Sequence, residues 1–60
     1  MDNYTIIIEI LTENPDLTIC EIQEKTFLEA MQIFNILEGA EYNFRFKKSK
    51  TDKGFVYSKI

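Results

Sequence analysis

The segment from Leu17 to Gly39 constrains the fold more than any other part of the chain, because it carries the signals for two short helices in direct succession. Thr18 is followed three residues later by Glu21, the pattern of a capping box, in which each side chain accepts a hydrogen bond from the other residue's backbone N–H. A helix is therefore expected from Ile19 to about Thr26. Thr26 and Phe27 both have weak helix propensity and end it.

A second helix is expected from about Leu28 to Glu38. Gly39 follows it, and glycine tolerates the left-handed conformation in which many helices end. Two helices with almost no linker between them must cross steeply. That arrangement is the helix-turn-helix motif.

A further helix is expected before this segment, from about Tyr4 to Glu13, with Asp2 or Asn3 as its cap and the single proline just beyond it. At about 100° per residue, its core-facing stripe consists of Tyr4, Ile7, Ile8 and Leu11. Ile6 and Ile10 form a second apolar ridge beside that stripe. The three consecutive isoleucines also suit a strand, which is the alternative reading of this stretch.

The pattern changes from helical to alternating after Gly39. A strand is expected there, with one face made of Tyr42, Phe44 and Phe46 and the other of Asn43, Arg45 and Lys47. Residues 49–54 are polar and end in glycine, which suits a hairpin loop, and Phe55–Tyr57 is the expected returning strand. The chain is thus expected to be one α+β domain, residues 1–60, with three helices followed by a β-hairpin.

This order of elements resembles the winged helix-turn-helix family. The resemblance rests on residues 17–26, residues 27–37 and the hairpin of residues 44–60, which looks like the wing of that family. It implies a compact α+β fold and raises the expectation of DNA binding through the third helix. Two positions depart from the family: Gln23 stands where a small residue is common, and Phe27 stands where glycine is frequent. We therefore expect a wider or altered crossing of the two helices.

The residue types present exclude most catalytic and metal sites. The chain has no histidine and a single cysteine, Cys20, so neither a disulfide nor a Cys/His zinc site is available. We expect no enzyme, no metal and no cofactor, because the usual nucleophile and base arrangements need an imidazole or a second reactive group. No apolar run approaches the roughly 20 residues that span a bilayer, and no signal peptide is expected, which favours a cytoplasmic protein.

The charges are divided along the chain, although the formal net charge is only -3. Residues 1–41 carry nine acidic side chains and one base, whereas residues 42–60 carry six bases and one acid. Such asymmetry bears on partners rather than on the fold. The acidic part is expected to attract a basic partner, and the basic hairpin is the candidate for nucleic acid.

The third helix has two plausible registers. If Phe27, Ala30, Met31, Phe34 and Leu37 face the core, the outward residues are Leu28, Glu29, Gln32, Asn35 and Ile36. In the usual register of the family, with Leu28, Ile33 and Ile36 or Leu37 inside, the outward residues are Glu29, Ala30, Met31, Phe34 and Asn35. Both registers expose apolar residues and an acid but no base, which disfavours insertion into a DNA groove.

Our first hypothesis is therefore a small regulatory module that docks on a protein, either itself as a homodimer or a transcription regulator. The predicted protein-binding residues are Ile6, Ile10, Leu28, Glu29, Gln32, Phe34, Asn35 and Ile36. A helix that is apolar nearly all round is usually buried on both sides, and a partner can supply the second side. The alternative is that the hairpin folds over this face within the same chain.

The second hypothesis is a DNA-binding transcription factor of the winged-helix kind, with Gln32 and Asn35 contacting bases. The predicted phosphate contacts are Arg45, Lys47, Lys48, Lys50 and Lys53. Two further interpretations of the hairpin stay open. Its lysines are also typical of a solvated edge that resists aggregation, and its interleaved aromatic and basic residues could stack single-stranded bases.

Overall fold

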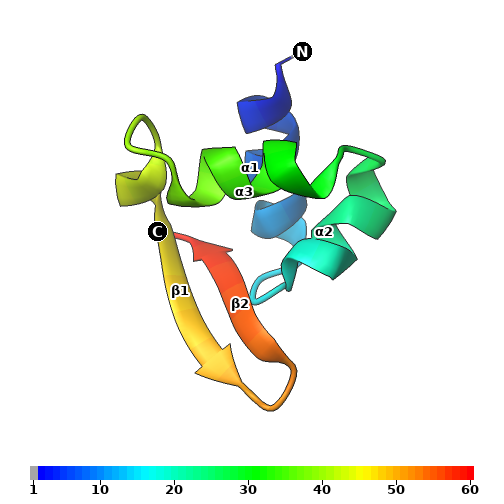
Figure 1. Cartoon of the computed structure of the whole chain (residues 1–60), viewed down its shortest axis with the longest axis vertical. Coiled ribbons are helices and arrows are strands. Elements are labelled where there is room, and N and C mark those ends of the chain that lie inside the picture. The colour runs from blue at the N-terminus through cyan, green and yellow to red at the C-terminus, as the bar shows by residue number, and fades with distance from the viewer. Residues whose placement is uncertain (1) are drawn as a thin grey trace.

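The computed structural model describes residues 2–60. Its elements are α1 (Asn3–Glu13), α2 (Ile19–Thr26), α3 (Ala30–Glu38), the short 3₁₀ helix η1 (Asn43–Arg45), β1 (Phe46–Thr51) and β2 (Gly54–Lys59). The three helices lie together, and the two antiparallel strands extend away from them as a hairpin (Figure 1). This layout confirms the α+β fold class predicted from the sequence.

The first of the three helices forms where a strand was the alternative. Asp2 is the N-cap of α1, and its carboxylate accepts a hydrogen bond of 2.8 Å from the backbone N–H of Thr5. Ile7 and Leu11 are buried one helical turn apart. The isoleucine run is therefore helical because its i to i+4 spacing gives α1 one continuous buried side.

The bounds of α2 are those predicted, because both halves of the capping box form. The backbone N–H of Thr18 donates to Glu21 Oε1 at 2.9 Å, and the backbone N–H of Glu21 donates to Thr18 Oγ1 at 3.1 Å. The helix ends at Thr26, and the residue that caps it, Phe27, has a left-handed backbone with φ 61° and ψ 18°. Phe27 thus takes the backbone conformation that glycine more often supplies at a corner, at a cost of about 1–2 kcal/mol for a residue with a Cβ.

Replacing Phe27 with glycine is expected to stabilise the fold by about 0.5–1 kcal/mol. Relief of the left-handed strain exceeds the extra entropy that glycine gives the unfolded chain. Lys25→Gly is the matched control, because Lys25 is exposed within α2 and its loss should cost about 1 kcal/mol. Urea unfolding followed by circular dichroism checks both variants. Equal destabilisation by the two glycines would contradict the prediction.

The third helix begins at Ala30, two residues later than predicted, because Leu28 and Glu29 lead the chain out of the left-handed corner. It ends at Glu38, and Gly39 has φ -72°, so the expected left-handed glycine is not found. Glycine is required at position 39 because there is no room for a side chain. A Cβ at Gly39 would overlap the backbone carbonyl oxygen of Asn35.

The hairpin also begins later than predicted. Residues 42–45 form a turn and η1 rather than a strand, and Phe44 is 64% exposed. The prediction that Tyr42, Phe44 and Phe46 share one strand face is therefore wrong. Tyr42 instead stacks on Tyr4 of α1, with ring centroids 4.1 Å apart, and this contact holds the chain away from the sheet. The returning strand is longer than predicted and starts at Gly54, whose φ of +103° belongs to the turn.

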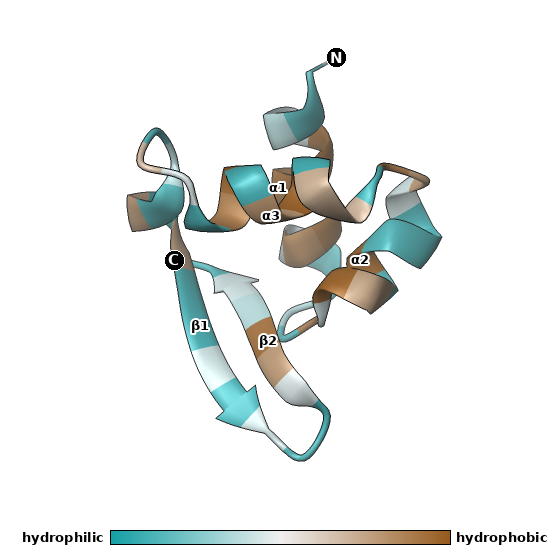
Figure 2. Cartoon of the chain, in the orientation of Figure 1, coloured by the Kyte–Doolittle hydropathy of each residue, from teal (hydrophilic) through white to brown (hydrophobic). Residues whose placement is uncertain are grey.

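The core lies between the helices and β2. Its buried apolar residues are Ile7, Leu11, Leu17, Ile22, Ile33, Leu37, Phe46, Val56 and Tyr57. Leu17 and Tyr57 exchange two backbone hydrogen bonds, of 3.1 and 2.7 Å, so β2 has a backbone partner on each side. Figure 2 shows that apolar residues gather on β2 while most of β1 is hydrophilic. The hairpin is thus held to the helices chiefly through β2 and through Phe46 at the start of β1, and the rest of β1 is the exposed edge of the sheet.

Candidate docking face on the third helix

The orientation of α3 decides which side chains are available to a partner. Ile33 and Leu37 are fully or almost fully buried, and Leu28 and Ile36 are half-buried against the same core. This arrangement confirms the register in which the outward residues include Glu29, Ala30, Met31, Phe34 and Asn35. The other register is wrong because Leu28 turns inward at the corner, which sets the rotation of the helix that follows.

Three large apolar side chains remain outside on this helix and its corner. Phe27 is 90% exposed, Met31 65% and Phe34 46%. Met31 and Phe34 are three residues apart on α3, so they are neighbours on the helix surface. We call Phe27, Met31 and Phe34 the α3 face. Burial of such side chains is worth about 1.5–3 kcal/mol each, so their exposure forgoes stability that a partner can supply.

The hairpin does not cover the α3 face. Its contact with α3 is at the C-terminal end of the helix, where Lys48 Nζ lies 2.7 Å from Glu38 Oε2 and the Tyr57 hydroxyl donates to the same oxygen at 2.7 Å. Phe27 lies at the opposite end of the helix, before its first residue. The alternative in which the hairpin folds over the apolar side of the third helix is therefore wrong.

The structure divides the predicted protein-binding residues into two groups. Glu29, Gln32, Phe34 and Asn35 are exposed, whereas Ile6, Ile10, Leu28 and Ile36 are half-buried. All of the second group except Ile6 pack against the core. Phe27 and Met31 were missing from the predicted set. The signal for Phe27 was the frequency of glycine at such a corner, and the signal for Met31 was its outward place in the usual register of the family.

Within residues 2–60, Glu38 and Glu21 form ion pairs with lysines, whereas Glu24 and Glu29 do not. Hydrogen bonds from Lys48, and then from Tyr57, hold the pKa of Glu38 below its usual range. The pKa of Glu21 is lowered by the backbone N–H of Thr18 and by Lys53, whose Nζ lies 3.2 Å from the carboxylate. Glu24 and Glu29, on either side of Phe27, are exposed and make no ion pair among residues 2–60.

The predicted nucleic-acid residues are all exposed, but they do not form one track. Lys48 forms an ion pair with Glu38, and Lys53 forms one with Glu21. These two lysines are therefore partly compensated by acids of the same chain. Alternation along β1 places Lys47 on the side opposite to Lys48 and Lys50. Arg45, at the end of η1, instead lies 5.1 Å from the centre of the Phe44 ring.

Stacking of single-stranded bases on the rings that alternate with bases in the sequence, Tyr42, Phe44 and Phe46, is weakened by their positions. Phe46 is buried, and Tyr42 is half-buried in its stack with Tyr4. Phe44 alone of the three rings is freely exposed. A single ring does not make the series of platforms that such binding uses.

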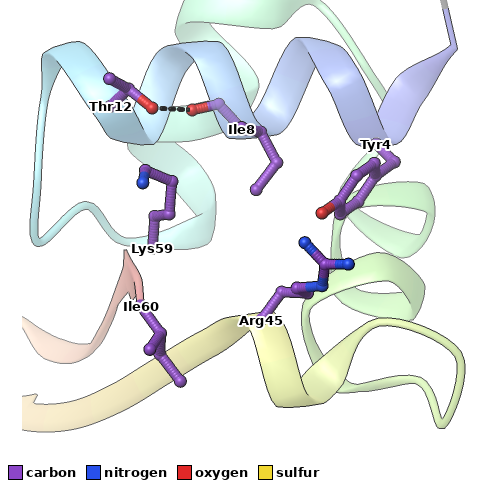
Figure 3. Close-up of a pocket in the computed structure, with 6 residues that line it drawn as sticks. All are labelled: Tyr4, Ile8, Thr12, Arg45, Lys59 and Ile60. Carbon is purple, nitrogen blue, oxygen red and sulfur yellow. Dashed lines mark hydrogen bonds between the residues drawn. The ribbon is translucent and has the colours of Figure 1, made fainter.

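A pocket of about 300 Å³ lies between α1 and the base of the hairpin (Figure 3). Its lining consists of Tyr4, Ile8, Thr12, Arg45, Lys59 and Ile60. The Thr12 hydroxyl is already used, because it donates to the backbone oxygen of Ile8 at 2.7 Å. Arg45 and Lys59 extend toward α1 and are exposed, so water screens both charges. The volume is at the lower limit of ligand sites, and the α3 face contributes nothing to it.

Residues 2–60 contain neither a cluster of metal ligands nor a helix that could span a membrane. In that range no three His, Cys, Asp or Glu side chains converge as metal ligands. No helix of the described chain has the length and apolar content needed to cross a bilayer. Compared with protein-family models, with curated proteins and with solved structures, the chain shows no significant match.

Proposed function

We propose that this protein is a small non-catalytic regulatory module that docks on a protein partner through the α3 face. The observation that carries the proposal is the exposure of Phe27, Met31 and Phe34 on α3 and the corner before it, in a 60-residue chain. Small soluble domains rarely leave neighbouring aromatic and methionine side chains in water unless a partner covers them, and these residue types are enriched at protein interfaces.

The partner is either a second copy of the chain or a transcription regulator, and the module acts in the cytoplasm. The order of three helices and a hairpin supports assignment to the winged helix-turn-helix family. In that family the third helix meets DNA, whereas here it presents apolar side chains and Glu29. A carboxylate facing phosphates is repelled, which favours a polypeptide as the occupant.

DNA binding through the hairpin is the second candidate. Lys47, Lys50 and Arg45 favour it, because all three are exposed and make no ion pair within the described part of the chain. Such contacts would position the protein on the phosphate backbone without reading the base sequence. The affinity for DNA would then fall steeply as the salt concentration rises.

Site-specific cross-linking distinguishes the two candidates. A photoreactive benzoylphenylalanine in place of Met31 is expected to give a discrete cross-linked polypeptide in cells, while the same group in place of Glu9, exposed on α1, gives none. Phe34→Glu should abolish the product and leave the helical circular dichroism intact, because exposed substitutions usually change stability by about 0.5 kcal/mol or less. Mass spectrometry identifies the product.

The contrary result is equally specific. If position 31 gives no product, and a low-salt mobility shift with DNA is lost in Lys47→Glu/Lys50→Glu but kept in Phe34→Glu, the protein is a DNA-binding factor. Low salt is the sensitive condition, since phosphate contacts are strongest there.

A further inference from the structure

The hairpin carries a second uncovered apolar group, and this one is surrounded by bases. Phe55 on β2 is 50% exposed. The ammonium groups of Lys48 and Lys50 lie 4.7 and 5.7 Å from the centre of its ring. The pairing of Lys50 with Phe55 and of Lys48 with Tyr57 places all four on one side of the hairpin. We call Phe55 and Lys50 the hairpin face.

The hairpin face is turned to the same end of the molecule as the C-terminus of α3. Tyr57 and Lys48, which share its side of the sheet, both reach Glu38. The hairpin extends away from the helices, so α3 and the strands form two arms that meet near Glu38 (Figure 1).

The two faces are complementary in charge and alike in apolar content. Glu24 and Glu29, which precede and follow Phe27 in the sequence, are exposed and make no ion pair within residues 2–60, while the hairpin face carries the ammonium of Lys50. Opposite charges around an apolar centre are the usual arrangement of a specific interface.

The two faces cannot meet within one chain. The ion pair and the hydrogen bond from the hairpin to α3 are both at Glu38, and the length of α3, about 13 Å, lies between that residue and the corner that holds Phe27. A second copy does not have this restriction. In a two-fold dimer, each contact between residues i and j occurs twice, so one complementary pair of faces is enough to close the assembly.

We propose that the occupant of the α3 face is the hairpin face of a second copy, in a two-fold antiparallel dimer. This inference rests on the proposed docking function and names its partner. In the dimer, Phe55 of one copy lies against Phe27 and Met31 of the other, and Lys50 lies against Glu29. A standard interface takes about 800 Å² from each partner, roughly a fifth of the 4063 Å² that the chain exposes. Both arms are therefore needed to supply it.

Sedimentation equilibrium tests the dimer directly. Between about 10 μM and 1 mM chain, the mean mass is expected to rise from that of one chain toward that of two. Raising the salt from about 0.05 to 0.5 M should weaken the dimer about tenfold, because the charged contacts lie at the rim and are screened.

Charge reversal tests the arrangement within the dimer. Glu29→Lys and Lys50→Glu should each weaken association about tenfold, and the double variant should restore most of it, because each reversed charge meets the other twice. Lys47→Glu is the matched control, since Lys47 points to the opposite side of β1. It should leave the dissociation constant unchanged at matched net charge.

Three results would overturn the inference, and each leads to a different interpretation of the α3 face. A monomer at about 1 mM removes the dimer, while a cross-link from position 31 to another polypeptide would keep the docking function. A dimer that responds to Lys47→Glu as strongly as to Lys50→Glu removes the hairpin face from the interface. A dimer lost in Phe34→Glu but not in Lys50→Glu joins α3 to α3 instead.

Discussion

Replacement of Ile33 with alanine is expected to leave much of the population unfolded at about 25 °C. Ile33 is fully buried on the inner side of α3, and truncation of such a residue to alanine typically costs about 2–5 kcal/mol through lost burial and a residual cavity. The core of a 60-residue chain with a single cysteine supplies only about 3–5 kcal/mol in total. The loss is therefore comparable with the whole stability of the domain.

Urea unfolding monitored by circular dichroism measures the effect, and the next residue provides the control. Phe34→Ala removes a larger side chain from the same helix, but Phe34 is 46% exposed. Its midpoint should move by a small fraction of the shift caused by Ile33→Ala. Similar shifts for the two variants would mean that the rotation of α3 described above is wrong.

Alkaline pH is expected to destabilise the fold through Tyr57. Burial, and then the Glu38 carboxylate that accepts its hydroxyl proton, raises the pKa of Tyr57 to about 12. The folded chain thus holds the phenolic proton more tightly than the unfolded chain, in which tyrosine titrates near 10. The stabilisation is complete below about pH 10 and is lost as the pH rises from about 10 through 12. A difference of about two pK units corresponds to roughly 2–3 kcal/mol.

The free energy of unfolding between about pH 9 and pH 12 checks this dependence. Tyr57→Phe should start less stable, because Glu38 loses a donor, and should fall less steeply with pH. All other titratable groups are the same in both proteins, so the difference between the two curves isolates the phenol. Parallel curves would show that Tyr57 titrates alike in the folded and unfolded chains.

The elements that depend on neighbouring residues were predictable from the sequence. The capping box of Thr18 and Glu21 has both partners within one turn, so the bounds of α2 followed directly. The start of β1 did not, because the alternation of residues 42–46 was overridden by the stack of Tyr42 on Tyr4 from the other end of the chain. Local patterns carry no information about such a contact.

The sequence predicted that the third helix presents a docking site, but the predicted residues did not include Phe27 and Met31. Apolar residues surround α3, so periodicity left two rotations open until the inward position of Leu28 selected one. One of the two registers placed Phe27 in the core, yet at the left-handed corner it is 90% exposed. The ion pairs of Lys48 and Lys53 join residues distant in sequence, so their partial neutralisation could not be read from the charge count.

The paired hydrogen bonds between Leu17 and Tyr57 have a consequence for how the molecule comes apart. An isolated two-stranded hairpin is marginally stable in water. The order of β2 therefore depends on its bridge to Leu17, which lies between α1 and α2. The helices in turn lose part of their core when Phe46 and Tyr57 leave. Separation of the hairpin and melting of the helices are therefore one cooperative event, and neither half of the chain is an autonomous folding unit.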